Sequence, residues 1–264
     1  MEYSVITSKE NKLIKSVKKL LTSAKERKQT GTFVLEGLRL SADAALNGYT
    51  IDTLIICDSI DESDRLKALI KSAQVIVKVP ESLFSYISDT VSPQGVMCVV
   101  KMPEKKTVDD IVNGRYIVLE NTQDPANLGT IARTAEAFGI SGLVVLNKSC
   151  DPFSPKAQRA GMGALLRLPV ISADDISKTL QAFKGKGFKL FASVVGDADC
   201  DVTKTDFSGN CAVLIGNEAN GLTDIAIKHC DRRITITMQG RAESLNAAAA
   251  ASVIMWEMTR SEVE

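Results

Sequence analysis

The chain has 264 residues, of which 45% are hydrophobic and 24% charged, a composition typical of a globular protein and not of a disordered one. Its 32 Lys and Arg balance 32 Asp and Glu, so any nucleic acid would have to meet a local basic patch. The longest uncharged apolar stretch near a terminus, 244–256, is too short to cross a bilayer, and the N-terminus lacks the apolar core of a signal peptide.

The six cysteines are scattered, none of them in a C-x-x-C pair, and the chain has a single histidine. Structural metal sites generally use closely spaced ligand pairs, so this pattern predicts that the protein holds no metal. Free thiols in a chain of this size are typical of a reducing compartment. We therefore expect a cytoplasmic protein without a membrane anchor.

The first hundred residues alternate between helical and strand-like patterns. Residues 8–28 carry eight Lys or Arg against two Glu, and their apolar stripe predicts a helix with a basic solvated face. Strands are expected at 32–35, 53–57, 75–79 and 96–100, and helices at 38–46, 62–70 and 81–87. This alternation predicts an α/β domain over 1–100, and the polar stretch 101–115 is typical of a linker.

Residues 116–264 form the second predicted domain. Strands are expected at 116–119, 143–146, 189–194, 212–215 and 233–237, with another after Pro169. Helices are expected near 128–138, 155–166 and 174–183, and from 244 onward. The strands lack polar alternation, which predicts a mostly parallel sheet covered on both faces. Ligands of such sheets bind beyond the carboxyl ends of the strands.

Two loops that follow predicted strands are rich in small and polar residues. In the first, Asn127 is expected to cap the next helix, and Arg133 lies off the apolar face of that helix. In the second, Gly216 and Gly221 bracket Glu218, and glycine permits a close backbone approach to a ligand. Taken alone, the first loop favours an ordinary helix cap and the second a tight turn.

A third loop precedes the last helix. Ser244 is expected to cap that helix, and Asn246 to open its first turn, where backbone N–H groups are available to a ligand. A purely structural cap is again compatible with this loop by itself. The sequence contains neither a G-x-S-x-G motif nor a P-loop, so serine hydrolysis and P-loop phosphoryl transfer find no support.

Taken together, the three loops closely resemble the SpoU/TrmH family of RNA ribose methyltransferases in the SPOUT superfamily. The matching positions are Asn121, Pro125, Asn127, Gly129, Arg133, Ala135 and Gly139; Gly216, Asn217, Glu218, Gly221 and Leu222; and Ile236, Met238, Gly240, Glu243, Ser244, Leu245 and Asn246. Two positions depart from the family pattern, because Thr237 stands where proline is frequent and Ala219 where glycine is frequent. The first hundred residues resemble the substrate-binding domain often attached in this family, most recognisably at 33–37.

The resemblance implies an α/β chain with a C-terminal SPOUT domain, which has a mostly parallel sheet and a deep trefoil knot. It also implies a smaller N-terminal α/β domain with a ribosomal-protein-like RNA-binding fold, and a homodimer. The implied activity is methyl transfer from S-adenosylmethionine to a ribose 2′-hydroxyl of RNA, in 23S or another ribosomal RNA. A tRNA ribose methyltransferase, a base-nitrogen methyltransferase and a non-catalytic RNA-binding or ribosome-assembly factor are the alternatives.

The resemblance also implies roles for individual residues. The implied catalytic-site residues are Asn127, Arg133, Glu218, Ser244 and Asn246. The implied cofactor-binding residues are Leu214, Gly216, Asn217, Gly221, Ile236, Met238 and Leu245. Candidate RNA-binding residues are Lys12, Lys15, Lys18 and Lys19 on the basic helix, together with Arg133. Arg133 could act as a base toward the hydroxyl or as an electrostatic partner of a neighbouring phosphate, since its unperturbed pKa is about 12.5–13.8.

Overall fold

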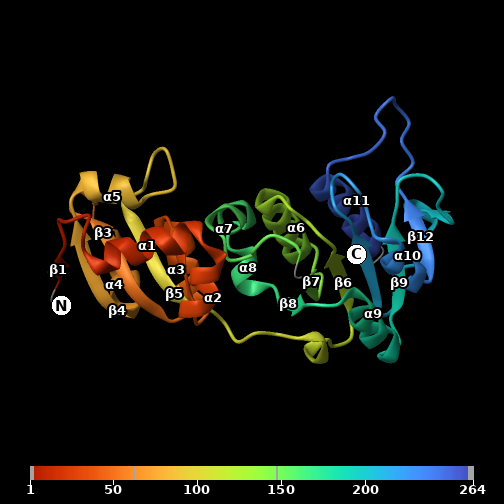
Figure 1. The fold of residues 1–264 in the computed structure, drawn as a ribbon, viewed down its shortest axis with the longest axis horizontal. Helices are drawn as coiled ribbons and strands as arrows, with labels where there is room; N and C mark the ends of the chain where they lie inside the picture. The colour runs from red at the N-terminus through yellow and green to blue at the C-terminus, as the bar shows by residue number, and fades with distance from the viewer. Residues whose placement is uncertain (1–2, 62, 147, 261–264) are drawn as a thin grey trace. The chain divides into compact units, whose positions relative to one another are not determined.

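The computed structural model describes residues 3–61, 63–146 and 148–260. Residue 62 of the predicted helix 62–70 and the outermost residues of both predicted domains lie outside this part. The chain divides into two units (Figure 1): Met1–Glu104 with Asp151–Leu166, and Lys105–Cys150 with Arg167–Glu264. None of the helices in the described part is long and apolar enough to span a membrane.

The first unit is built on a mixed sheet of five strands in the order β1-β4-β3-β5-β2. Its strands are β1 (Ser4–Val5), β2 (Thr32–Glu36), β3 (Ile51–Cys57), β4 (Ala73–Val79) and β5 (Val96–Lys101). Strands β1, β4 and β3 run parallel, while β5 is antiparallel to both of its neighbours. The short edge strand β1 was not predicted from the sequence.

Helices cover both faces of this sheet. They are α1 (Lys12–Thr22), α2 (Ala24–Thr30), α3 (Leu38–Leu46), α4 (Asp64–Ser72), α5 (Glu81–Ile87), α7 (Pro155–Gly161) and α8 (Ala164–Arg167). The buried residues of α1 and α5 share one core with alternate strand residues, and those of α3 and α4 share the other. The predicted helix 8–28 is in fact two helices, because Ser23 is extended and its hydroxyl caps α2 by accepting from the N–H of Glu26.

Residues 151–166 join the first unit, although the sequence placed them within the second predicted domain. Phe153 and Leu166 pack into the core that α3 and α4 cover. The buried guanidinium of Arg27 pairs with Asp151 at 2.7 Å and donates to the carbonyl of Leu20 at 2.6 Å. The predicted helix 155–166 is broken where Met162 adopts a positive φ of 49°. These contacts depend on the tertiary fold, so local patterning could not predict them.

The second unit contains a seven-stranded sheet in the order β10-β12-β9-β11-β6-β7-β8. Its strands are β6 (Arg115–Leu119), β7 (Gly142–Leu146), β8 (Val170–Ala173), β9 (Lys189–Ser193), β10 (Cys200–Asp201), β11 (Cys211–Ile215) and β12 (Arg232–Thr235). Every pairing between these strands is parallel. This sheet confirms the predicted α/β fold with a mostly parallel sheet, while the trefoil knot stays a prediction.

The helical elements of this unit are η1 (Val108–Asp110), α6 (Pro125–Ala137), α9 (Ile176–Gly185), η2 (Val202–Lys204), α10 (Asp224–His229) and α11 (Ala247–Thr259). Helices α9 and α10 cover one face of the sheet, where the rings of Tyr116, Phe183 and Phe188 cluster. Helix α6 packs against α11 and β7. Strands β6 and β11 are neighbours and run parallel. The loops that follow them therefore lie at the same end of the sheet, as the sequence predicted.

Candidate active site

Three polar side chains from separate segments form one hydrogen-bonded chain. The amide nitrogen of Asn127, in the first turn of α6, donates to Oε1 of Glu218 at 2.9 Å. The amide nitrogen of Asn246, at the start of α11, donates to Oδ1 of Asn127 at 3.1 Å. The structure thus brings together three of the five residues implied as catalytic. Asn127 is the buried centre of the group, at 8% exposure, and the other two are exposed.

The helix caps differ from those predicted. Asp124 caps α6, because its carboxylate accepts from a backbone N–H at 3.0 Å. Asn127 therefore lies inside the helix with its amide committed to the hydrogen-bonded chain. Asn246 caps α11 through its side-chain oxygen, and Ser244 is exposed two residues earlier. The expectations that Asn127 and Ser244 cap these helices were wrong, because several Asx or Ser residues near each start could fill the role.

The loop that carries Glu218 is held from both sides. Oε2 of Glu218 accepts from the backbone N–H of Gln123 at 3.4 Å and from Nδ2 of Asn217 at 3.5 Å. The same amide of Asn217 donates to the carbonyl of Asn121 at 2.8 Å. The side-chain amide of Asn217, which the resemblance implied to bind the cofactor, therefore stabilises the loop instead.

Glu120 is a buried carboxylate that sequence reasoning missed. It follows β6 directly, is 3% exposed, and accepts from the backbone N–H of Thr223 at 2.9 Å and from its hydroxyl at 2.7 Å. These bonds fix the start of α10 to the end of β6. The signal in the sequence was a charged residue directly after an apolar strand. A carboxylate in such a place is rarely buried unless it has hydrogen-bond partners.

Gly216 is required by close backbone packing. Asn217 and Gly221 exchange two backbone hydrogen bonds, at 3.0 and 2.9 Å, which close a tight turn. A Cβ atom at Gly216 would lie 2.2 Å from the carbonyl carbon of Gly221, far inside van der Waals contact. Glycine at position 216 therefore allows the chain to leave β11 and return over its own backbone.

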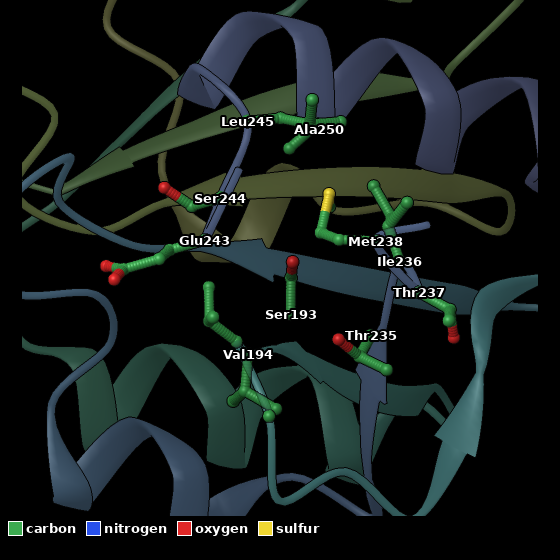
Figure 2. Close-up of a pocket in the computed structure, with 12 residues that line it drawn as sticks. Ser193, Val194, Thr235, Ile236, Thr237, Met238, Glu243, Ser244, Leu245 and Ala250 are labelled. Atoms are coloured by element: carbon green, nitrogen blue, oxygen red, sulfur yellow. The ribbon is translucent and has the colours of Figure 1, made fainter. Parts of the chain in front are cut away.

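A cavity of about 370 Å³ lies beside these segments (Figure 2). Its lining comes from the loops after β9 and β12 and from the start of α11: Ser193, Val194, Val195, Gly196, Thr235, Ile236, Thr237, Met238, Glu243, Ser244, Leu245 and Ala250. Predicted cofactor residues Ile236, Met238 and Leu245 line it, together with Ser244. The segment 193–196 was missed, although small residues after an apolar strand were a usable signal.

Four of the residues implied to bind a cofactor do not line this cavity. Leu214 points into the core of the sheet and is fully buried. Gly216 serves the backbone turn described above. Asn217 and Gly221 line a second cavity of about 660 Å³, together with Asn121, Gln123, Lys148, Asn220, Leu222, Thr223 and Asp224. Four of these nine lining residues are Asn or Gln, and another, Lys148, follows β7 in the chain.

The first cavity has the size and chemistry of a small-molecule site. Its volume falls in the range of about 300–1,000 Å³ that is typical of ligand pockets. Apolar side chains such as Val194 and Leu245 can cover an aromatic ring, while Ser193 and Glu243 offer a hydroxyl and a carboxylate. This combination of apolar walls and a few polar groups is typical of ligand pockets. Within the described ranges, no cluster of three or more His, Cys, Asp or Glu is arranged to hold a metal ion.

Arg133 does not join the hydrogen-bonded chain within one molecule. It is exposed on α6, six residues and about 120° of helical rotation from Asn127. It has neither a hydrogen bond nor an ion pair to any residue in the described part of the chain. The neighbouring Thr134 hydroxyl contacts Ser252 of α11 at 3.2 Å, which shows which side of α6 faces the last helix.

The four candidate RNA-binding lysines of α1 are not equivalent. Lys15 pairs with Glu10 at 2.5 Å. Lys18 donates to the carbonyl of Tyr86 at 2.9 Å, and its ammonium lies 4.6 Å from the centre of that ring. Lys12 and Lys19 are exposed and form no ion pair with any residue that the structure describes. Two of the four ammonium groups are thus available to phosphates without first breaking a contact.

Comparison with known proteins finds a separate match for each half of the chain. Residues 114–256 match the SpoU rRNA Methylase family, and residues 11–98 match the MRM3-like substrate binding domain. A 23S rRNA (guanosine-2′-O)-methyltransferase of Bacillus subtilis strain 168 is 28% identical, with 96% of this chain and 98% of the relative covered. A 23S rRNA (uridine-2′-O)-methyltransferase of Streptomyces viridochromogenes is 30% identical, with 92% and 88% covered.

A solved structure gives the same picture. The AdoMet-bound rRNA methyltransferase from Sinorhizobium meliloti superposes with a TM-score of 0.89 at 28% identity, covering 99% of each chain. These relatives confirm the predicted enzyme class and cofactor, an S-adenosylmethionine-dependent RNA 2′-O-methyltransferase. With more than half of its length matched by the family model, this chain belongs to the SpoU rRNA methylase family.

Proposed function

We propose that this SpoU-family enzyme methylates a ribose 2′-hydroxyl of ribosomal RNA at the group formed by Asn127, Glu218 and Asn246. The observation that carries the proposal is the hydrogen-bonded chain that joins these residues across three segments. Leu245 lines the first cavity and directly precedes Asn246, so the polar group and the cavity share the start of α11. The relatives named as 23S rRNA 2′-O-methyltransferases support ribosomal RNA as the substrate.

The residues of the first cavity would hold the cofactor. Ile236, Met238 and Leu245 provide apolar walls, and the carboxylate of Glu243 can attract an ammonium group. Bound S-adenosylmethionine supplies the methyl group on an activated sulfonium. Because the donor is already activated, the task of the protein is alignment, which can lower a barrier by about 7–11 kcal/mol in favourable cases.

Glu218 would orient the ribose, since its exposed carboxylate can bond a hydroxyl, and Asn127 would hold that carboxylate in place through its amide. Only RNA offers a 2′-hydroxyl, so these partners also select RNA over DNA. Arg133 would bind the adjacent phosphate or assist removal of the hydroxyl proton. The second cavity is lined partly by Asn217 and Asn220 of the loop that carries Glu218, and we place the neighbouring RNA chain along it. The first unit, with Lys12 and Lys19, would supply further phosphate contacts.

A homodimer is part of the proposal. Helix α11 is apolar around most of its circumference, and such helices are normally buried on all sides. Here Val253 is 38% and Trp256 46% exposed. A second copy of the chain covering this face would bury both, and light scattering after size-exclusion chromatography measures the state directly. A monomer at micromolar concentration would refute the dimer.

The cellular location is the remaining part of the proposal. None of the six cysteines forms a disulfide bond within the part of the chain that the structure describes. Free thiols of this number are typical of proteins in a reducing compartment. We therefore place the enzyme in the cytoplasm, with ribosomal RNA.

The decisive experiment digests RNA treated with the enzyme and labelled S-adenosylmethionine to nucleosides. A 2′-O-methylnucleoside is expected, whereas a base-methylated product or the absence of any product would contradict the proposal. Arg133→Ala should abolish transfer and leave cofactor binding, measured by calorimetry, within twofold of the parent. Loss of cofactor binding in this variant would instead assign Arg133 a structural role.

A further inference from the structure

The wall of the first cavity is held from outside by a carboxylate. Oδ2 of Asp201 accepts hydrogen bonds from the backbone N–H of Thr237, at 3.2 Å, and from its hydroxyl. The two residues are 36 positions apart in the chain. The register explains how they meet: β10 pairs with β12 in parallel and places Asp201 opposite Thr235, so the carboxylate reaches two residues beyond, where the neighbouring strand has ended.

The other oxygen of the same carboxylate is equally engaged. Oδ1 of Asp201 accepts from the backbone N–H of Thr203 at 2.9 Å and from its hydroxyl at 2.6 Å. These hydrogen bonds, those of Thr203 first and those of Thr237 next, hold the pKa of Asp201 well below its usual range. Asp201 is therefore ionised at neutral pH, and its bonds are charge-assisted, which makes them stronger than bonds between neutral groups.

The segment that Asp201 holds is the one that shapes the cavity. Strand β12 ends at Thr235, and the next three residues leave the sheet. Ile236 and Met238 flank Thr237, and all three line the cavity. Figure 2 shows them as one extended segment along a wall, with the hydroxyl of Thr237 directed away from the sulfur of Met238. Fixing Thr237 from behind therefore fixes the two apolar side chains on either side of it.

We propose that Asp201 is a positioning residue that pre-organises the cofactor site by holding Thr237, and through it Ile236 and Met238, in the binding geometry. Ordering this segment before binding removes an entropic cost that the ligand would otherwise bear. The inference rests on the proposed function only in taking S-adenosylmethionine as the ligand of the first cavity. Neither residue needs to contact the RNA or the reacting atoms for this role.

The test compares three single variants and one double variant by isothermal calorimetry with S-adenosylmethionine. Thr237→Val keeps the shape and the backbone N–H and removes only the hydroxyl, while Asp201→Asn removes the charge. Hydrogen bonds to a charged group are stronger than those between neutral groups. Asp201→Asn weakens both bonds to Thr237 and Thr237→Val removes one of them, so we expect about tenfold weaker binding for Asp201→Asn and about threefold for Thr237→Val. The affinity of the double variant should be within twofold of that of Asp201→Asn, because the two changes disrupt the same contact.

Thr203→Val is the matched control, since it removes the hydroxyl that bonds the other oxygen of the same carboxylate. Its cofactor affinity should stay within twofold of the parent. Steady-state kinetics should show a raised KM for S-adenosylmethionine in Asp201→Asn and Thr237→Val, with an unchanged KM for RNA. An effect of Thr203→Val equal to that of Thr237→Val would show a general structural role and overturn the proposal.

Hydrogen exchange on the ligand-free protein gives a readout independent of the cofactor. The amides of 236–238 should exchange faster in Asp201→Asn and in Thr237→Val, whereas those of β11 should not change. Parent protein that binds no S-adenosylmethionine would contradict the proposed function, and exchange would still decide on the role of Asp201. Variants that match the parent in both exchange and affinity would overturn the inference.

Discussion

The amide of Asn127 joins the three segments of the candidate active site, so its isosteric replacement tests the arrangement directly. In Asn127→Asp, a second carboxylate would face Glu218 across the 2.9 Å that the amide now bridges. Two like charges about 3 Å apart repel by about 5 kcal/mol at an effective dielectric constant of about 20. The new aspartate can avoid this repulsion by taking up a proton when the chain folds. Protonation costs about 1.4 kcal/mol for each pH unit above the unfolded-state pKa of about 3.9, and this cost is the upper limit of the penalty.

The ceiling on the loss of unfolding free energy is therefore about 4 kcal/mol at pH 7 and about 1.5 kcal/mol at pH 5. Urea denaturation at both pH values measures it, and we expect a loss of about 2–4 kcal/mol at pH 7 because Asn127 is buried and Glu218 is exposed. The control Asn127→Ala removes the hydrogen bond without adding charge and should cost about 1–2 kcal/mol at both pH values. If Asn127→Asp lowers the unfolding free energy by the same amount at pH 7 and pH 5, charge repulsion with Glu218 is not the cause of the loss.

Three further predictions concern other parts of the chain. Gly216→Ala should lower the unfolding free energy by more than about 2 kcal/mol, because the new Cβ would lie 2.2 Å from a backbone carbonyl carbon, and a loss below about 1 kcal/mol in urea denaturation would contradict this packing. Burial raises the pKa of the Cys98 thiol to about 12, so above about pH 9 only the unfolded state ionises. Above about pH 9, the unfolding free energy of the parent should therefore fall with rising pH more steeply than that of Cys98→Ala, by about 1.4 kcal/mol per pH unit. Equal slopes for the two proteins would contradict this prediction. The double variant Lys12→Gln/Lys19→Gln should bind RNA with a weaker salt dependence, by about two phosphate contacts. Lys15→Gln, which also frees Glu10, is the comparison. If this single change has an equal effect, pairing with Glu10 does not keep Lys15 from binding phosphate.

Most helices and strands could be predicted from the sequence, because their formation depends on the local periodicity of apolar residues. Runs of apolar residues without polar alternation predicted strands covered on both faces, and β6, β7 and β11 are such strands. The same reasoning predicted that polar loops after parallel strands would lie at one end of the sheet. It missed the two-residue strands β1 and β10, since two residues carry no measurable period.

The amino-acid sequence was enough to predict the types of the main elements, the polar loops and, through a resemblance, the family. Which of these loops meet became known from the folded chain. Asn127 lies 91 positions from Glu218 and 119 from Asn246, and Asp201 reaches Thr237 across a strand pairing. Periodicity reports how each segment is buried, but the partner of a side chain depends on strand order and register, which are properties of the whole sheet. That is why the partners of Asn127 and the residues lining the cavity could be found only in the fold, whereas the caps of α6 and α11 were missed because several neighbouring residues could fill the same role.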